Sequence, residues 1–380
     1  MTGAMYAAIS GLKAHMNKLN VISNNIANVN TYGYKTQRTI FSDSIYTTMS
    51  SGSDGTQTAG AVNPSQIGYG VEMSSVDLDM SSGTFSPTGR DMDCMIMGDG
   101  FFLVGDKDLT FDAFNAESLT SLSLTRVGNF EFKADGYLSD ANGNVVYGFL
   151  STGVVNPGQN GDGGVVFSDQ LVPICLPKLV VTTDEQTGAV TKTVGYPSVN
   201  DAGQLVPAEG DFLGMDSIAI DPVTGIITGT SKDTKEVITI GVIAMGNVTN
   251  PSGVTHLSGP YYQANMGAGD LQISLMGGVA SSMRICNKVE EGTSFDDTEA
   301  FVYVNQSMAG GADAANGQPD GMLIFDAGTT ELMTGGLEMS KTDLATEISE
   351  MITTQRGYQA NTRIITVTDS MLEELVNLKR

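Results

Sequence analysis

Residue types that carry much of enzyme and metal chemistry are scarce in this sequence. Its 380 residues include no tryptophan, two histidines and three cysteines. Cys94, Cys175 and Cys286 lie far apart and form no C-x-x-C pair, so neither a disulfide framework nor a cysteine metal site is indicated. His15 and His256 have no partner at the spacing of zinc ligands. We therefore predict no metal and no cofactor, and we interpret the cysteines as small buried side chains.

Long hydrophobic runs are also missing. No stretch approaches the ~20 apolar residues that a membrane-spanning helix needs. The first residues lack the charged segment and the apolar segment of a signal peptide. We expect neither membrane insertion nor a cleaved signal peptide.

Catalytic and ligand-binding motifs are absent or incomplete. The sequence contains neither G-x-S-x-G nor G-x-x-x-x-G-K-[ST], which are common nucleophile and phosphate-binding motifs. Residues 135–140 resemble half of a calcium loop but lack its further acidic ligands, so we interpret them as a hairpin turn. Asp91 and Asp93 stay open as a paired acid and base, without companion residues. We predict a protein without enzymatic activity.

Acidic residues strongly outnumber basic ones. The sequence holds 43 Asp and Glu against 19 Lys and Arg, a formal net charge of −24. Residues 1–40 carry +4 and residues 337–380 carry −2, which leaves −26 on residues 41–336. Such a surface repels nucleic acid and anionic membranes. This distribution suits a polymer joined at its ends with acidic middles facing water, although an ordinary acidic domain would also show it.

The N-terminal segment has the periodicity of an amphipathic helix. Its apolar residues are spaced alternately by four and three positions, as in a heptad seam. The seam consists of Met5, Ile9, Leu12, Met16, Leu19, Ile22 and Ile26. An Asn-rich run with Gly33 after it predicts the end of the helix, because Asn and Gly tolerate left-handed backbone. The run comprises Asn24, Asn25, Asn28 and Asn30.

A similar stripe follows the C-terminal segment. It runs through Leu344, Ile348, Met351, Gln355, Tyr358, Ile365, Leu372 and Val376. Burying one apolar side chain contributes about 1.5–3 kcal/mol, whereas ordering the backbone costs about 1–2 kcal/mol per residue. A lone helix whose stripe stays in water is therefore marginal. Each end needs a partner helix, which is the opposite end of the chain, another subunit, or both.

Strand signals fill the region between the two helices. Asp135-Gly136 and Asn142-Gly143 follow or precede alternating apolar residues and predict consecutive hairpins. Residues 71–80 alternate with one phase slip at Ser74-Ser75, which predicts a β-bulge. Residues 237–245 are typical of a buried strand. The predicted fold class is mixed α and β, with terminal α-helices pairing as a coiled coil and two β-rich domains between them.

Several motifs resemble the rod and hook proteins of the bacterial flagellum. At the N-terminus these are residues 10–12, 23–28 and 30–35, where Tyr34 replaces the Phe that the family prefers. The C-terminal match is strong, although Lys341 stands where the family usually has Asn. The other matching segments are 63–71, 98–102, 126–130, 135–138, 143–144, 337–340, 343–344, 351–352, 355–356, 358–361, Arg363 and 378–380. Residues 151–336 match weakly.

The resemblance implies a structural subunit of the flagellar hook, a flexible tubular universal joint that transmits motor torque from rod to filament. It implies a helical homopolymer, with flagellar rod, hook cap and hook–filament junction proteins and the flagellar export apparatus as further partners. The implied location is the extracellular hook and basal body. The expected assembly interface consists of Met5, Ile9, Leu12, Met16, Leu19, Ile22, Asn24, Asn25, Ile26, Asn28, Leu344, Ile348, Met351, Gln355, Arg356, Tyr358, Asn361, Ile365, Leu372 and Leu375.

The expected domain organisation follows from the same resemblance. Residues 1–30 and 337–380 form the helical domain, and 31–66 form a linker rich in Ser, Gly and Thr. An inner β domain comprises 67–150 and 289–336, and an outer β domain comprises 151–288. Two alternatives stay open: a stiff distal rod subunit, and a secreted β-rich hydrolase or adhesin whose terminal helices pack together.

Overall fold

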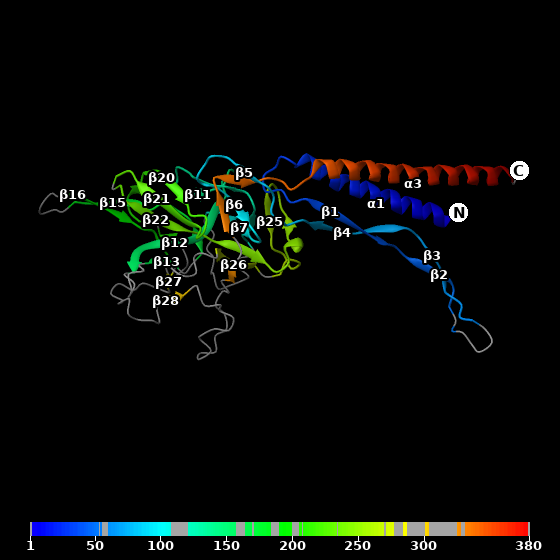
Figure 1. The fold of residues 1–380 in the computed structure, drawn as a ribbon, viewed down its shortest axis with the longest axis horizontal. Coiled ribbons are helices and arrows are strands. Elements are labelled where there is room, and N and C mark those ends of the chain that lie inside the picture. The colour runs from blue at the N-terminus through cyan, green and yellow to red at the C-terminus, as the bar shows by residue number, and fades with distance from the viewer. Residues whose placement is uncertain are drawn as a thin grey trace. The chain divides into compact units, whose positions relative to one another are not determined.

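The computed structural model divides the chain into two compact units. Unit 1 comprises residues 1–79 and 340–380, and unit 2 comprises residues 80–339. The structure describes residues 2–52, 54, 60–107, 121–156, 164–168, 171–183, 190–199, 205–206, 208–233, 235–269, 271–276, 284–286, 301–303, 325–327 and 331–378. These residues form two α-helices and many β-strands, paired mostly antiparallel, which is a mixed α and β fold (Figure 1). Neither described helix combines the length and apolar character that crossing a bilayer requires.

Unit 1 contains both helices and a β-ribbon. The helices are α1 (Thr2–Ala27) and α3 (Leu344–Leu378). The ribbon consists of β1 (Gln37–Asp43) antiparallel to β4 (Val71–Leu78), and of β2 (Tyr46–Ser50) antiparallel to β3 (Ser65–Gly68). The segment 31–66, expected as a linker, therefore contains β1, β2 and β3. The part of this segment that is rich in Ser and Gly lies between β2 and β3, and its composition did not reveal the strands on either side.

The helix ends follow the local signals in the sequence. The end of α1 at Ala27 agrees with the predicted Asn-rich stop, and Gly33 has a φ of 68°, a conformation that favours glycine. Asp343 caps the start of α3. Its carboxylate accepts hydrogen bonds from Thr346 Oγ1 at 2.7 Å and from the Ala345 N–H at 3.0 Å. These bonds lower the pKa of Asp343 from its ordinary value.

The ribbon contains the β-bulge predicted at residues 74–75. Ile40 lies opposite Ser75 and Phe41 lies opposite Met73, so Ser74 is the extra residue. A two-stranded ribbon alone is marginally stable in water and needs a further surface to pack on. Near the bulge the ribbon packs on α1. There the His15 and Phe41 rings form a T-shaped contact with their centroids 6.1 Å apart. The β-bulge prediction is confirmed.

Unit 2 consists of short strands and a buried core. Its first strands are β5 (Phe85–Pro87), β6 (Asp93–Met97), β7 (Phe101–Gly105), β8 (Ser123–Thr125), β9 (Gly128–Asn129), β10 (Glu131–Phe132), β11 (Leu138–Ser139), β12 (Val145–Asn156), β13 (Gly164–Ser168) and β14 (Val172–Pro173). The next are β15 (Lys178–Thr183), β16 (Val190–Gly195), β17 (Ser198–Val199), β18 (Leu205–Val206), β19 (Asp211–Phe212), β20 (Met215–Ile220), β21 (Ile226–Ser231), β22 (Val237–Ile243) and β23 (Met245–Val248). The last are β24 (Thr255–His256), β25 (Tyr261–Gln263), β26 (Leu271–Met276), β27 (Arg284–Cys286), β28 (Phe301–Tyr303), β29 (Phe325–Ala327), β30 (Glu331–Thr334) and β31 (Gly336–Glu338), and a 3-10 turn η1 (Pro251–Gly253) precedes β24.

Strand β12 organises the main sheet of unit 2. It pairs antiparallel with β7, β11, β14 and β22. The core beneath includes Phe102 and Phe130, whose rings pack edge to face with their centroids 4.9 Å apart. Both predicted hairpins are confirmed, because β10 pairs with β11 and β11 pairs with β12. The buried strand predicted at residues 237–245 is present as β22 and the start of β23.

The expected boundary between an inner and an outer β domain falls inside β12. This strand crosses residue 150, because it pairs with β22 at residues 148–150 and with β13 at residues 151–156. The division into 67–150 with 289–336 and 151–288 stays a prediction. Of the cysteines, Cys94 and Cys175 are buried and free, as expected for small core side chains. Burial raises the pKa of both thiols, and that of Cys175 reaches about 12.

Candidate assembly interface

Glycines allow a close approach between α1 and α3. A Cβ added at Gly11 would lie 2.6 Å from Asn361 Nδ2 on α3. In the same way, a Cβ added at Gly357 would lie 2.9 Å from the His15 ring on α1. Helix separation depends on the side chains at the contact, so glycines there reduce it. The two glycines lie on different helices, and each faces a larger side chain of the other helix about one turn from the other glycine.

The two helices share one antiparallel register, as Figure 1 shows. Gly11 lies against Asn361, His15 lies against Gly357, and Asn25 is bonded to Glu347. A step of a given number of residues toward the C-terminus of α1 therefore corresponds to an equal step toward the N-terminus of α3. In this register the start of α1 lies level with Ser370, and α3 therefore continues for about two further turns.

A polar cluster lies at the end of α1, around Asn25. Its Nδ2 donates to the Gln37 carbonyl at 2.8 Å and to Glu347 Oε1 at 3.0 Å. Its Oδ1 accepts from the Tyr34 hydroxyl at 3.0 Å and from the Gln37 N–H at 3.1 Å. Burial, and then the charge of Glu347, raise the pKa of Tyr34 to about 12. Burial also raises the pKa of Glu347, and the hydrogen bond from Asn25 opposes that shift.

The predicted N-terminal residues differ in how deeply they are buried. Of the ten expected residues in this segment, Ile22 and Asn25 are buried. Ile9 and Met16 are each 45% exposed. Asn24 is exposed as well, and the partly buried members are Met5, Leu12, Leu19, Ile26 and Asn28. Ile9 and Met16 of the predicted apolar seam are thus accessible on the folded chain, whereas its other members are buried or partly buried.

The predicted α3 residues divide into two groups. Met351, Tyr358, Asn361 and Ile365 are partly buried, on the side that faces α1. The exposed members are Leu344, Ile348, Gln355, Arg356, Leu372 and Leu375. Two residues absent from the prediction, Thr354 and Thr368, are the buried side chains of this helix. Their signal was a seven-residue repeat with Glu347 and Asn361 that hydropathy does not detect.

A second apolar stripe on α3 was missed by the sequence reasoning except for Leu375. Its members are spaced by three, four, four and three positions, so they share one face of the helix. We call this face the outer stripe, and it consists of Ile364, Val367, Met371, Leu375 and Leu378. Each side chain is at least 44% exposed. The stripe overlaps in sequence with the one facing α1, and this overlap concealed its separate periodicity.

The far part of the ribbon is also exposed and apolar. Every residue of β2 and β3 is exposed, in contrast to β1 and β4 beside α1. The large apolar side chains there include Ile45, Tyr46, Met49 and Ile67. An exposed ribbon that carries such side chains is a typical contact surface.

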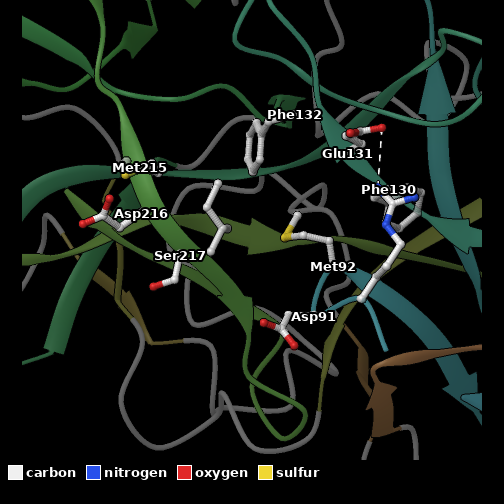
Figure 2. Close-up of a pocket in the computed structure, with 10 residues that line it drawn as sticks. Asp91, Met92, Phe130, Glu131, Phe132, Met215, Asp216 and Ser217 are labelled. Atoms are coloured by element: carbon white, nitrogen blue, oxygen red, sulfur yellow. Dashed lines mark ion pairs between the residues drawn. The ribbon is translucent and has the colours of Figure 1, made fainter. Parts of the chain in front are cut away.

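A groove in unit 2 provides the test for a catalytic site (Figure 2). It has a volume of about 470 Å³ and is open to solvent. Its carboxylates, from Asp91, Glu131 and Asp216, lie on different sides of the groove in Figure 2. Arg90 pairs with Glu131 at 3.5 Å, and Lys235 pairs with Asp216 at 2.5 Å and lowers its pKa. Two of the three carboxylates are thus engaged in ion pairs, and the third, Asp91, lines the groove apart from them.

The acidic residues considered from sequence have structural roles in the fold. Asp93 is buried and accepts a hydrogen bond from Thr88 Oγ1 at 2.6 Å, whereas Asp91 lines the groove. Asp140 accepts hydrogen bonds from the Asn142 and Asn144 N–H groups at 2.9 and 3.0 Å, which close the turn that follows residues 135–140. Among the residues that the structure describes, no group of His, Cys, Asp and Glu has the geometry of a metal site.

Comparison with known proteins gives matches at both ends and along the whole chain. Residues 5–35 match the family described as "Flagella basal body rod protein", and residues 333–378 match "Flagellar basal body rod FlgEFG protein C-terminal". The chain is 29% identical to the flagellar basal-body rod protein FlgG of Bacillus subtilis, with full coverage of both chains. It is 26% identical to the flagellar hook protein FlgE of Treponema pallidum, also with full coverage of both. Identity to the hook protein FlgE of Escherichia coli is 24%, over 99% of this chain and all of that protein.

Proposed function

The chain belongs to the family of flagellar rod and hook proteins, and we propose that it is a structural subunit of the flagellar hook. In this proposal the subunit polymerises through α1 and α3 into a flexible tube that transmits motor torque from rod to filament. The family membership makes it a component of the flagellum. The hook assignment is supported by the relatives named as hook proteins.

The observation that carries the proposal is the outer stripe of α3. Its five large apolar side chains lie in water on the described part of the chain: Ile364 and Val367 lie within the length of α3 that α1 covers, whereas Met371, Leu375 and Leu378 lie on the turns that continue beyond the start of α1. Burying each of them would contribute about 1.5–3 kcal/mol. On α1 the exposed Ile9 and Met16 offer a complementary apolar surface within the heptad seam. Copies of the chain can therefore join their terminal helices in a coiled coil that does not close on itself, which generates a helical polymer.

The other partners and the route of export belong to the same proposal. Rod, hook cap and hook–filament junction proteins would meet the subunit at the ends of the tube and at its growing tip. The flagellar export apparatus would deliver it without cleavage of a signal peptide. The acidic middle segment, 41–336, would face water outside the helical core of the tube.

Electron microscopy of polymers tests the proposal directly. The protein is concentrated by salting-out and imaged in negative stain, and we expect curved tubes. Substitution of Ile364, Val367 and Met371 by Ser should abolish the tubes, because it removes apolar area from the interface. Ser370→Ala, an exposed change on another face of α3, should leave them intact. Tubes of normal yield from the triple variant would refute the assembly role of the outer stripe.

A flagellar rod subunit is the second candidate. The observation in its favour is the full-length match to the rod protein of Bacillus subtilis at 29% identity. The same micrographs separate the two candidates, because a hook subunit gives curved tubes and a rod subunit gives straight stiff ones.

A further inference from the structure

We infer that the Asn25 side chain sets the register of the α1–α3 pair and couples this pair to the start of β1. The carboxamide is 1% exposed. A carboxamide offers two N–H donors and an oxygen with two lone pairs. Here both donors are used, by the Gln37 carbonyl and Glu347, and both lone pairs are used, by Tyr34 and the Gln37 N–H. All four hydrogen bonds lie between 2.8 and 3.1 Å.

The rest of the contact selects a register poorly. The buried Thr354 and Thr368 hydroxyls donate within α3, to the Glu350 and Ile364 carbonyls, each at 2.7 Å. These side chains therefore present methyl groups to α1 instead of hydrogen bonds. Gly11 and Gly357 remove bulk from the contact and do not add a directional interaction. Smooth contacts of this kind tolerate sliding of one helix along the other.

A seven-residue shift is the competing arrangement. Glu347, Thr354, Asn361 and Thr368 are spaced by seven residues, so the shift keeps the same face of α3 against α1. After it, Asn25 would meet Thr354, whose hydroxyl donates to its own helix and could offer Asn25 only a neutral oxygen as acceptor. Asn25 would therefore exchange a charge-assisted hydrogen bond to a carboxylate for a weaker one to a hydroxyl. A buried Asn that fixes helix register in this way is known from coiled coils.

The Lys18–Glu350 ion pair is a weaker discriminator. The two groups lie 3.0 Å apart, and their side chains are 24% and 49% exposed. Lys18 can therefore exchange Glu350 for water after a shift, whereas Asn25 cannot. The choice of register between α1 and α3 thus depends on the buried Asn25 amide.

The hydrogen bonds of Asn25 also couple the ordering of three segments, which are the end of α1, the start of β1 and the first turn of α3. Its amide bonds both the N–H and the carbonyl of Gln37, the first residue of β1, much as a neighbouring strand would. The same side chain reaches the first turn of α3 through Glu347. A displaced α3 would therefore withdraw one of the bonds that hold the α1 end against β1. The inference concerns contacts within one chain and is independent of polymer assembly.

Cysteine crosslinking in the full-length chain at low concentration reads the register. The pair H15C and G357C reports the observed register, and H15C with I364C or with E350C reports a shift of seven residues in either direction. Disulfides are located by peptide mass spectrometry, and intramolecular bonds are identified on non-reducing gels. In the parent and in N20A, which removes an exposed amide of the same helix, we expect the 15–357 bond at least tenfold in excess of the others.

Asn25→Val should lose this preference, with shifted crosslinks rising at least tenfold. An unchanged 15–357 preference in N25V, or its absence in the parent, would overturn the inference.

If N25V forms none of the three bonds, a double-mutant cycle tests whether the side chains at positions 25 and 347 are coupled. Asn25→Asp places a carboxylate against Glu347 and should reduce the 15–357 bond. Adding E347Q should restore part of it, because the carboxamide introduced at position 347 can donate to the carboxylate introduced at position 25. An equal effect of E347Q with and without N25D would mean that the two side chains are not coupled.

Discussion

A buried ion pair joins β31, the last strand of unit 2, to Arg126, the residue that follows β8. Arg126 and Glu338 side chains are each 1% exposed, and Arg126 Nη1 lies 3.9 Å from Glu338 Oε2. Glu338 Oε1 also accepts from the Gly83 N–H at 2.7 Å, and Arg126 Nη2 donates to the Gly98 carbonyl at 2.9 Å. Burial lowers the pKa of Arg126, and Glu338 opposes that shift. The pair therefore ties the chain segments at both edges of the unit to the end of β8.

Removing one partner of this pair should destabilise unit 2 strongly. Arg126→Met leaves a buried carboxylate without its cation, and we expect a loss of about 3–5 kcal/mol in the free energy of unfolding. The double variant R126M/E338M should lose less than the sum of the single changes. Urea unfolding monitored by tyrosine fluorescence measures the free energy of unfolding of each variant. Arg90→Met is the control, because its exposed pair with Glu131 should contribute only about 0–1 kcal/mol, and equal losses from R90M and R126M would contradict the prediction.

Tyr34 should make unit 1 sensitive to alkaline pH. Its pKa is raised to about 12 in the folded chain, whereas an unfolded tyrosine has a pKa of about 10. Between these values the folded state keeps a proton that the unfolded state releases. The contribution of Tyr34 is therefore complete below the unfolded pKa and is lost as pH rises through the folded pKa.

Unfolding of the helices, followed by far-ultraviolet circular dichroism across this pH range, measures the effect. Tyr34→Phe should remove the corresponding slope of stability with pH, and Tyr32→Phe, at an exposed position nearby, should retain it. The slope attributed to Tyr34 is the difference between parent and Y34F, which cancels other titrating groups. An identical slope in both proteins would rule the mechanism out.

At the scale of elements, the sequence predicted what local signals specify. The end of α1, the bulge at Ser74 and the hairpins at 135–136 and 142–143 depend on nearby residues, and all are confirmed. The face of α1 that meets α3 was not predictable by hydropathy, because Gly11 and Asn25 carry no apolar signal. Asn25 was identified as an interface residue, but its four bonds depend on Gln37 and Glu347, which are far apart in sequence.

The close approach of α1 and α3 should be sensitive to side-chain size at Gly11. Leu at this position would overlap Asn361 and force the helices apart, with an expected cost of about 1–3 kcal/mol. Ala should be tolerated, because Asn361 can move its flexible end and Ala favours a helix interior by up to about 1 kcal/mol over Gly. Thermal unfolding of the helical signal measures both changes. Asn20→Leu adds the same side chain on the exposed face, and a loss as large as that of G11L would disprove the steric explanation.

At the scale of the whole molecule, attraction and repulsion reside in different segments. The terminal segments carry the exposed apolar stripes and a charge near zero, whereas residues 41–336 carry −26. Assembly must therefore gain enough from the helices to offset repulsion between neighbouring middle segments. Apolar burial changes modestly with salt, whereas repulsion between exposed charges is screened, with a Debye length of about 10 Å at 0.1 M and about 3 Å at 1 M.

Polymerisation should consequently become easier as ionic strength rises. Sedimentation of polymer at a series of salt concentrations gives the critical concentration, which we expect to fall severalfold between low and high salt. Neutralising three exposed acids of the middle segment, in D106N/D211N/E236Q, should weaken this salt dependence because it reduces the repulsion that salt screens. Val367→Ser, in the outer stripe, should instead raise the critical concentration at every salt concentration and leave the dependence unchanged. A critical concentration that rises with salt would show that attraction between charges holds the subunits together, and would overturn the assignment of adhesion to the apolar faces of the helices.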